Sequence, residues 1–154
     1  MLRKAIGLSR RGLAGKPPQQ SGLDLDAAPF VPDGWKVEEH QKGGQFKWDA
    51  SKVALYLSKE QQGGKWLESN KLREELKGKP LYNANLLDYL HANPHLIPEE
   101  WRGKVVFFWG TIYRRPSVGL CVRCLCWNGD GWLWSSGWFV DDWGGRSPAA
   151  LPAS

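Results

Sequence analysis

Three cysteines in the run "CVRCLC", Cys121, Cys124 and Cys126, have the residue type and spacing closest to a reactive or metal-binding motif. A C-x-x-C pair binds zinc when a tight turn brings both thiolates to one ion, usually with a second pair downstream. Here the run lies within a predicted strand, which turns Cys121 away from the other two, and no second pair follows. We therefore expect buried, reduced thiols, no metal and a cytoplasmic location.

The remaining candidates for acid–base chemistry are two histidines and two aspartates. His91 and His95 are four residues apart, but Pro94 between them should end any helix that would align them. Asp141 and Asp142 are adjacent, and adjacent side chains of a strand point to opposite faces. No glycine-rich phosphate loop or nucleophile–base pair accompanies them. The sequence thus predicts no enzyme, no catalytic residue and no cofactor.

Tryptophan is the residue type that points to binding instead. Five of the ten tryptophans lie between Cys126 and Trp143, around the turn sequence "NGDG". That sequence predicts a β-hairpin. A turn of two or four residues pairs odd positions before it with even positions after it, so one face of the hairpin collects the indoles and an arginine. These predicted binding residues are Trp127, Trp132, Trp134, Trp138 and Arg123.

Two interpretations of this indole face remain open. It is either the core of a small domain or a partly open aromatic platform. Arg123 and Ser136 are costly to bury without partners, which favours a face that partly meets water. Such platforms suit sugar rings, proline-rich peptides and unstacked bases alike. We expect a non-catalytic binding or interaction module whose ligand is a protein, a glycan or single-stranded nucleic acid, with a purely structural aromatic core as an alternative.

The charge distribution supplies another alternative. The chain has 21 basic and 16 acidic residues, and five of the basic residues precede Lys36. We therefore predict that residues 1–30 form a disordered basic leader and linker. The alternative function is that of a nucleic-acid-associated protein, in which the basic leader supplies the affinity. The leader's Arg-rich, acid-free start is also typical of an organellar transit peptide. No apolar run approaches the ~20 residues that span a bilayer.

Helical patterns occupy the middle of the chain. Residues 68–78 place two leucines one turn apart, and residues 83–94 have Asn83 as a cap and Pro94 as a stop. "IPEEW" predicts a single further turn. The segment "ASKVALYLSKEQ" fits a helix capped by Asp49, although its alternating apolar residues also suit a strand.

Strand patterns follow at residues 104–113, 119–127 and 131–140. A less regular hairpin is predicted within residues 31–48. The predicted fold is α+β, with short helices followed by a three-stranded antiparallel β-meander. Residues 31–145 form its single domain, and residues 146–154 form a C-terminal tail.

Several long blocks of the sequence carry a resemblance to a known family. They are "NANLLDYL", "NPHLIPEEW", "VFFWGTIYR" and "LCVRCLCWNGD". From about Val31 to its end, the chain resembles a family of small uncharacterised bacterial proteins known from environmental genomes. That family has no assigned function. The resemblance therefore implies a bacterial, intracellular protein, and it carries over no catalytic residues.

Overall fold

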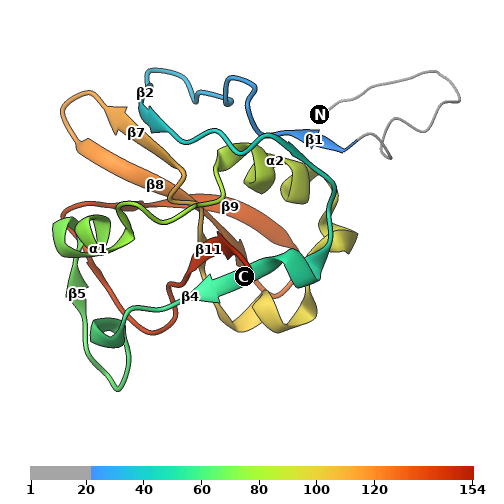
Figure 1. Ribbon diagram of the computed structural model, residues 1–154. Coiled ribbons are helices and arrows are strands. Elements are labelled where there is room, and N and C mark those ends of the chain that lie inside the picture. Colours follow the sequence, from blue (N-terminus) through green and yellow to red (C-terminus); the bar gives the residue numbers. More distant parts are fainter. Residues whose placement is uncertain (1–21) are drawn as a thin grey trace, which may run out of the picture.

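The protein is dominated by one curled sheet. The computed structural model describes residues 22–154, and the predictions made for residues 1–21 of the basic leader lie outside the described residues. Seven of the eleven strands in the described part form a half-barrel, accompanied by two small sheets and two α-helices (Figure 1). The prediction of a three-stranded meander preceded by short helices is therefore wrong. Most of the additional strands have only two to five residues, too short for alternation to reveal them.

The predicted meander survives as the central part of the large sheet. It consists of β7 (Thr111–Arg115), β8 (Gly119–Trp127) and β9 (Trp132–Trp138), each antiparallel to the next. The predicted "NGDG" hairpin is confirmed, because Trp127 pairs with Trp132 across a four-residue turn.

A bend in the chain splits the predicted strand 104–113 in two. Its halves are β6 (Val106–Phe107) and β7, which pair with opposite halves of β8. Gly110 lies at the bend, against the backbone of the next layer. A Cβ atom there would lie 2.7 Å from the carbonyl oxygen of Tyr82, so only glycine fits without displacement. The fork between β6 and β7 starts the curl of the sheet.

Strands from both ends of the chain extend the two arms of this fork. On one arm, β2 (Lys36–His40) pairs with β7. On the other, β11 (Ala149–Pro152) runs parallel to β6 and antiparallel to β4 (Val53–Tyr56). β11 lies inside residues 146–154, for which the sequence predicts a tail. β4 forms where the sequence fits both a helix and a strand.

Two small sheets complete the strand pairing. β1 (Leu23–Asp24) pairs with β3 (Gln45–Phe46), and β5 (Leu67–Glu68) pairs with β10 (Asp142–Trp143). The predicted hairpin within residues 31–48 is wrong, because β2 and β3 pair with β7 and β1 and not with each other. β1 also lies within the residues predicted as leader and linker.

The helices lie where their apolar spacing and caps predict them. α1 spans Ser69–Leu76 and α2 spans Ala84–Ala92. Short 3-10 turns are η2 (Ala50–Lys52), η3 (Lys59–Gln61), η4 (Pro94–Leu96) and η5 (Glu99–Gly103). Asn83 caps α2 and is buried, and its side-chain amide donates to the carbonyls of Leu25 and Gln41. Within residues 22–154, no helix is long and apolar enough to cross a bilayer.

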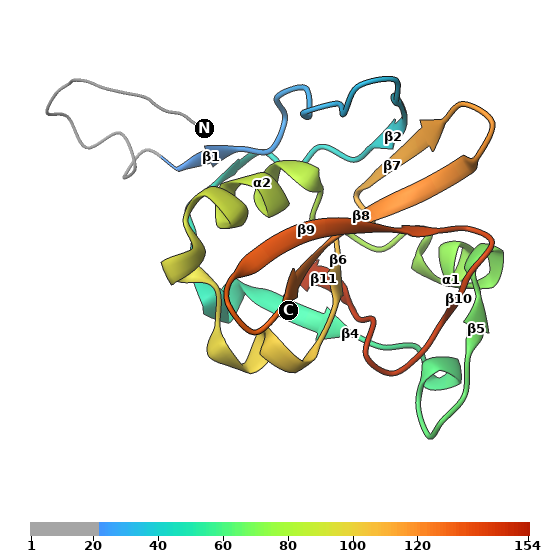
Figure 2. The ribbon, with the colours of Figure 1, turned by 180° about the vertical axis from the view of Figure 1, so that it is seen from behind.

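The central strands have packed side chains on both faces. On one face, α2 contributes Leu86, Leu87 and Leu90 to a core that includes Leu125 of β8. On the other face, a second core contains α1 leucines, Phe107, Trp109 and Trp143. Trp132 and Trp134 pack against the core that contains the α2 leucines, so the indole face of the β8–β9 hairpin is the one turned toward α2. Figure 2 shows α2 next to β9.

Candidate functional site

The β8–β9 hairpin brings the predicted binding residues to one face. Leu125 pairs with Trp134, Arg123 with Ser136 and Cys121 with Trp138. Since paired residues share a face, this register confirms the predicted parity. The four indoles of Trp127, Trp132, Trp134 and Trp138 are all half-buried, whereas Arg123 is completely buried.

Arg123 anchors α2 to the sheet. Its two terminal nitrogens donate to the carboxylate oxygens of Asp88 at 2.7 and 3.0 Å. Burial opposes the charged guanidinium, but hydrogen bonds and attraction from Asp88 outweigh it, so the pKa of Arg123 lies above its usual value. The expectation that Arg123 signals a water-exposed face is wrong, because Asp88 supplies the partner that burial requires.

Aromatic rings enclose the Arg123 guanidinium. Its Cζ atom lies 4.1 Å from the ring centroid of Trp134, 5.3 Å from that of Phe30 and 5.9 Å from that of Tyr113. The Phe30 side chain is 53% exposed, so the enclosure reaches the molecular surface. Arg123 therefore supports Trp134 from the interior and does not itself line the surface.

A second cluster extends the indole face beyond the hairpin. Trp35, just before β2, meets Trp134 and Trp138 with ring centroids 6.2 Å apart in each pair. The Cζ atom of Arg115 lies 4.9 Å from the Trp138 ring and 5.4 Å from the Trp35 ring. Guanidinium groups are attracted to the faces of such rings. We call Trp35, Trp134, Trp138 and Arg115 the indole cluster.

The other two predicted indoles lie at the turn end of the hairpin. Trp127 and Trp132 are cross-strand neighbours, with centroids 5.5 Å apart and planes inclined at 61°. Arg102 of η5 places its Cζ atom 3.9 Å from the centroid of the Trp127 ring. The predicted indoles thus lie in two groups of edge-to-face or tilted rings, each with an arginine against an indole.

Sequence reasoning missed Trp35, Phe30, Arg115 and Arg102. Trp35 lies about a hundred residues before Trp138 in the chain and reaches it only because β2 joins the far side of β7. No local periodicity reports such a contact. Only residue type could have indicated these contacts. Trp35 is a tryptophan with no predicted role, and Arg102 and Arg115 lie close to predicted strands.

The cysteines lie as the strand parity predicts. Cys121 packs with Tyr113 on the indole side, and Cys124 lies in the core on the opposite face. Burial raises the pKa of Cys121 to about 11 and that of Cys124 to about 12. It also raises the pKa of the half-buried Cys126. Across residues 22–154, no three His, Cys, Asp or Glu side chains gather as a metal site would require.

His40 is the histidine with structural partners. Its Nε2 lies 3.1 Å from the carbonyl oxygen of Ala27 and its Nδ1 lies 2.9 Å from the hydroxyl of Thr111. The carbonyl can only accept, and the Thr111 hydroxyl already accepts from the Ala84 N–H. A neutral ring that donates from Nε2 and accepts the Thr111 hydroxyl proton at Nδ1 satisfies this network. Burial lowers the pKa of His40. The predicted candidates His91 and His95 are exposed.

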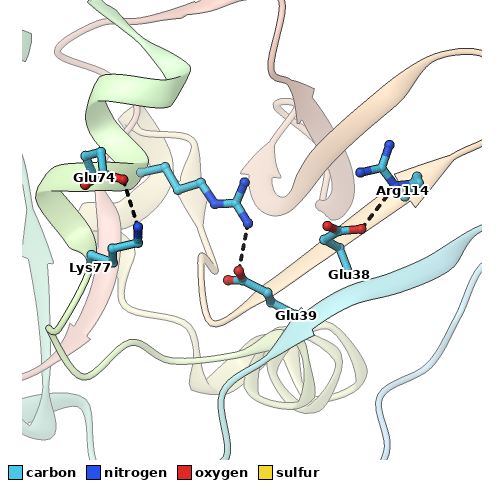
Figure 3. Close-up of polar contacts among 6 residues, drawn as sticks. Glu38, Glu39, Glu74, Lys77 and Arg114 are labelled. Carbon is cyan, nitrogen blue, oxygen red and sulfur yellow. Dashed lines mark hydrogen bonds and ion pairs between the residues drawn. The ribbon is translucent and has the colours of Figure 1, made fainter.

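A small hollow of about 130 Å³ lies between the C-terminal end of α1 and the β2 edge. Its rim carries paired charges, in which Arg73 donates to Glu39 at 2.7 Å and Lys77 donates to Glu74 at 2.8 Å. Figure 3 shows the Lys77–Glu74 pair and the hydrogen bond that Glu39 accepts from Arg73. Trp109 lines the hollow, but its indole nitrogen is buried from solvent without a partner among the described residues. A ligand cannot reach that nitrogen, so the indole cluster is the stronger site.

Comparison of the chain with protein-family models, with curated proteins and with solved structures finds no match.

Proposed function

We propose that the protein is a non-catalytic interaction module whose ligand contacts the half-buried indoles of the β8–β9 hairpin. One observation carries the proposal. The rings of Trp35, Trp134 and Trp138 are held against one another and against Arg115, yet they are not fully buried. Pre-positioned aromatic rings supply large contact areas at low entropic cost on binding. The family resemblance to bacterial proteins is compatible with this role and assigns no other.

The role of Arg123 within the proposal differs from the sequence-based one. Because Arg123 is buried and paired with Asp88, it does not contact a ligand. It acts as a positioning residue that holds Trp134 from below. Arg115 lies half-buried against two rings, and it replaces Arg123 as the cation that meets the ligand. The ligand-contacting residues are then Trp127, Trp132, Trp134 and Trp138, with Trp35 and Arg115 added.

The nucleic-acid alternative depends on the leader. Residues 22–154 hold 16 basic and 16 acidic residues, since all of the acidic residues and all but five of the 21 basic residues lie there. A neutral domain supplies little attraction for phosphates. Affinity for nucleic acid would therefore come from the five basic residues of positions 1–21. We favour a protein or glycan ligand at the indole cluster.

Fluorescence titration of the full chain tests the proposal. The probes are a chito-oligosaccharide, a proline-rich peptide and oligo(dT), each at low and high salt. We expect the peptide or the sugar to change the tryptophan emission with little salt dependence, and Trp138→Ala to weaken that binding at least tenfold. Trp66→Ala is the matched control, because Trp66 is 68% exposed and has no part in the indole cluster.

Three results would contradict the proposal. Binding of oligo(dT) alone, lost steeply as salt rises, would favour the nucleic-acid alternative. Equal loss in the Trp138 and Trp66 variants would place the site elsewhere. Failure of every probe to bind would leave the indoles as a purely structural core.

A further inference from the structure

β9 is an edge strand whose outer side is free within the described part of the chain. It pairs with β8 and with no other strand there. The N–H of Phe139 donates to Leu120 at 3.1 Å, and the N–H of Asn128 donates to Gly131 at 3.2 Å. These two bonds determine which residues of β9 are hydrogen-bonded to β8. Residues 133, 135 and 137 are, whereas the main-chain N–H and C=O groups of the residues between them point away from β8.

The outward residues include Trp134 and Ser136. Among residues 22–154, no hydrogen bond engages the main-chain N–H or C=O of either residue. The strand sequence, "WLWSSGW", carries no charge and no proline. Natural edge strands are usually protected by lysine, proline, a bulge or a covering element, because an open edge recruits further strands. β9 has seven half-buried or exposed residues and no such charge or proline.

We infer that the β9 edge binds the β9 edge of a second copy of this chain, antiparallel, to form one continuous sheet through a two-fold axis. The axis passes beside Ser135, which then lies opposite its own counterpart. Trp134 faces Ser136 of the partner subunit, and each such pair exchanges two main-chain hydrogen bonds. This inference concerns the strand edge and goes beyond the ligand surface proposed above.

The side chains of β9 match themselves in this register. Two large residues face small ones, since Trp134 lies beside Ser136 of the partner subunit and Leu133 lies beside Gly137 of the partner subunit. Gly137 borders a hollow of about 120 Å³, which Phe107 and Trp143 also line. The partner subunit's Leu133 is therefore placed at a hollow whose lining combines these two aromatic rings with Asp141, Asp142 and Ser147.

Self-pairing is favoured over pairing with an unrelated strand for two reasons. In this register Trp134 faces Ser136 of the partner subunit and Leu133 faces Gly137 of the partner subunit, so two kinds of pair set a large residue against a small one. No like charges come opposite one another, because the strand has none. Pairing also sets Trp132 beside Trp138 of the partner subunit, which joins the indole surfaces of the two copies.

Sedimentation velocity of the full chain, over a concentration series, tests the inference. We expect a reversible dimer for the wild-type chain. Ser135→Lys should raise the dissociation constant at least tenfold, because it sets two like charges directly opposite each other. Ser135→Glu should do the same, and an equimolar mixture of the two variants should restore the dimer. Ser135 is exposed, so these changes leave the fold intact.

Three further variants test the effect of added charge and the register. Val118→Lys adds the same charge at a residue 50% exposed in the β7–β8 turn, and it should leave the dimer unchanged. Ser135→Cys should form a disulfide-linked dimer on mild oxidation, whereas Val118→Cys and the wild-type chain should not. A wild-type monomer at all concentrations, or a dimer that survives Ser135→Lys, would overturn the inference. A monomer that still binds a probe through Trp138 would overturn the pairing alone.

Discussion

Arg123 of β8 and Asp88 of α2 form a two-pronged ion pair, with nitrogen–oxygen distances of 2.7 and 3.0 Å, beside the Trp134 ring. The arginine side chain has no exposed surface, and the aspartate side chain is 33% exposed. The pair fastens the helix to the strand that carries the indole face. Its loss should therefore affect both the stability of the fold and the placement of Trp134.

Asp88→Ala should destabilise the protein by about 3 kcal/mol, because it leaves the buried Arg123 charge without a partner. The partial exposure of Asp88 places this value at the low end for a buried pair. Urea unfolding followed by circular dichroism measures it. Glu99→Ala is the control: it breaks the exposed pair with Arg102 and should cost less than about 0.5 kcal/mol. Equal effects of the two variants would contradict the anchoring role of Asp88.

The features that could be predicted from the sequence are local ones. The Asn83 cap, the Pro94 stop and the parity of Trp132 and Trp134 depend on neighbours within a few residues, where helix and strand periods apply. From these alone, the hairpin face and both helices follow.

Pairing between distant segments could not be predicted. β11 inserts between β6 and β4, and β2 reaches β7 from more than seventy residues away. Each is too short to show alternation. Separation along the chain also hid Asp88, which lies 35 residues before Arg123 and makes that arginine a buried anchor where the sequence suggested a surface residue. The site therefore shifted toward Trp35 and Arg115, which no local pattern connects to the hairpin.

The stability of the protein should fall as the pH falls below about 6.5, in part through His40. Burial lowers the pKa of His40 from that ordinary value, so the unfolded chain takes up the proton first. The contribution is fully present above pH 6.5 and is lost as the pH falls toward the folded-state pKa. Thermal unfolding at pH 7.5 and 5.5 should show a smaller difference for His40→Gln than for the wild type. His91→Gln, at an exposed position, should behave like the wild type; an equal response of both variants would count against His40 as the source.

Native thiols should resist alkylation. The thiolate is the reactive form, and pKa values of about 11 for Cys121 and about 12 for Cys124 leave little of it at pH 8. Mass spectrometry after iodoacetamide treatment should find at most the half-buried Cys126 modified in the folded protein and all three cysteines modified in urea. Rapid labelling of Cys124 without denaturant would show that its side of the sheet opens.

Trp134→Ala should destabilise the protein by about 2 kcal/mol, between the cost of a surface change and the ~3–5 kcal/mol of a core aromatic. Trp134 is half-buried and covers the Arg123 guanidinium. Urea unfolding gives the cost, and acrylamide quenching gives the exposure of the indoles. Both are best measured in a Trp66→Phe background, because the 68% exposed Trp66 would otherwise dominate the quenching. In that background the variant should lose part of the quenchable emission. A loss of 4 kcal/mol or more with unchanged quenching would make Trp134 a core residue and remove it from the proposed binding surface.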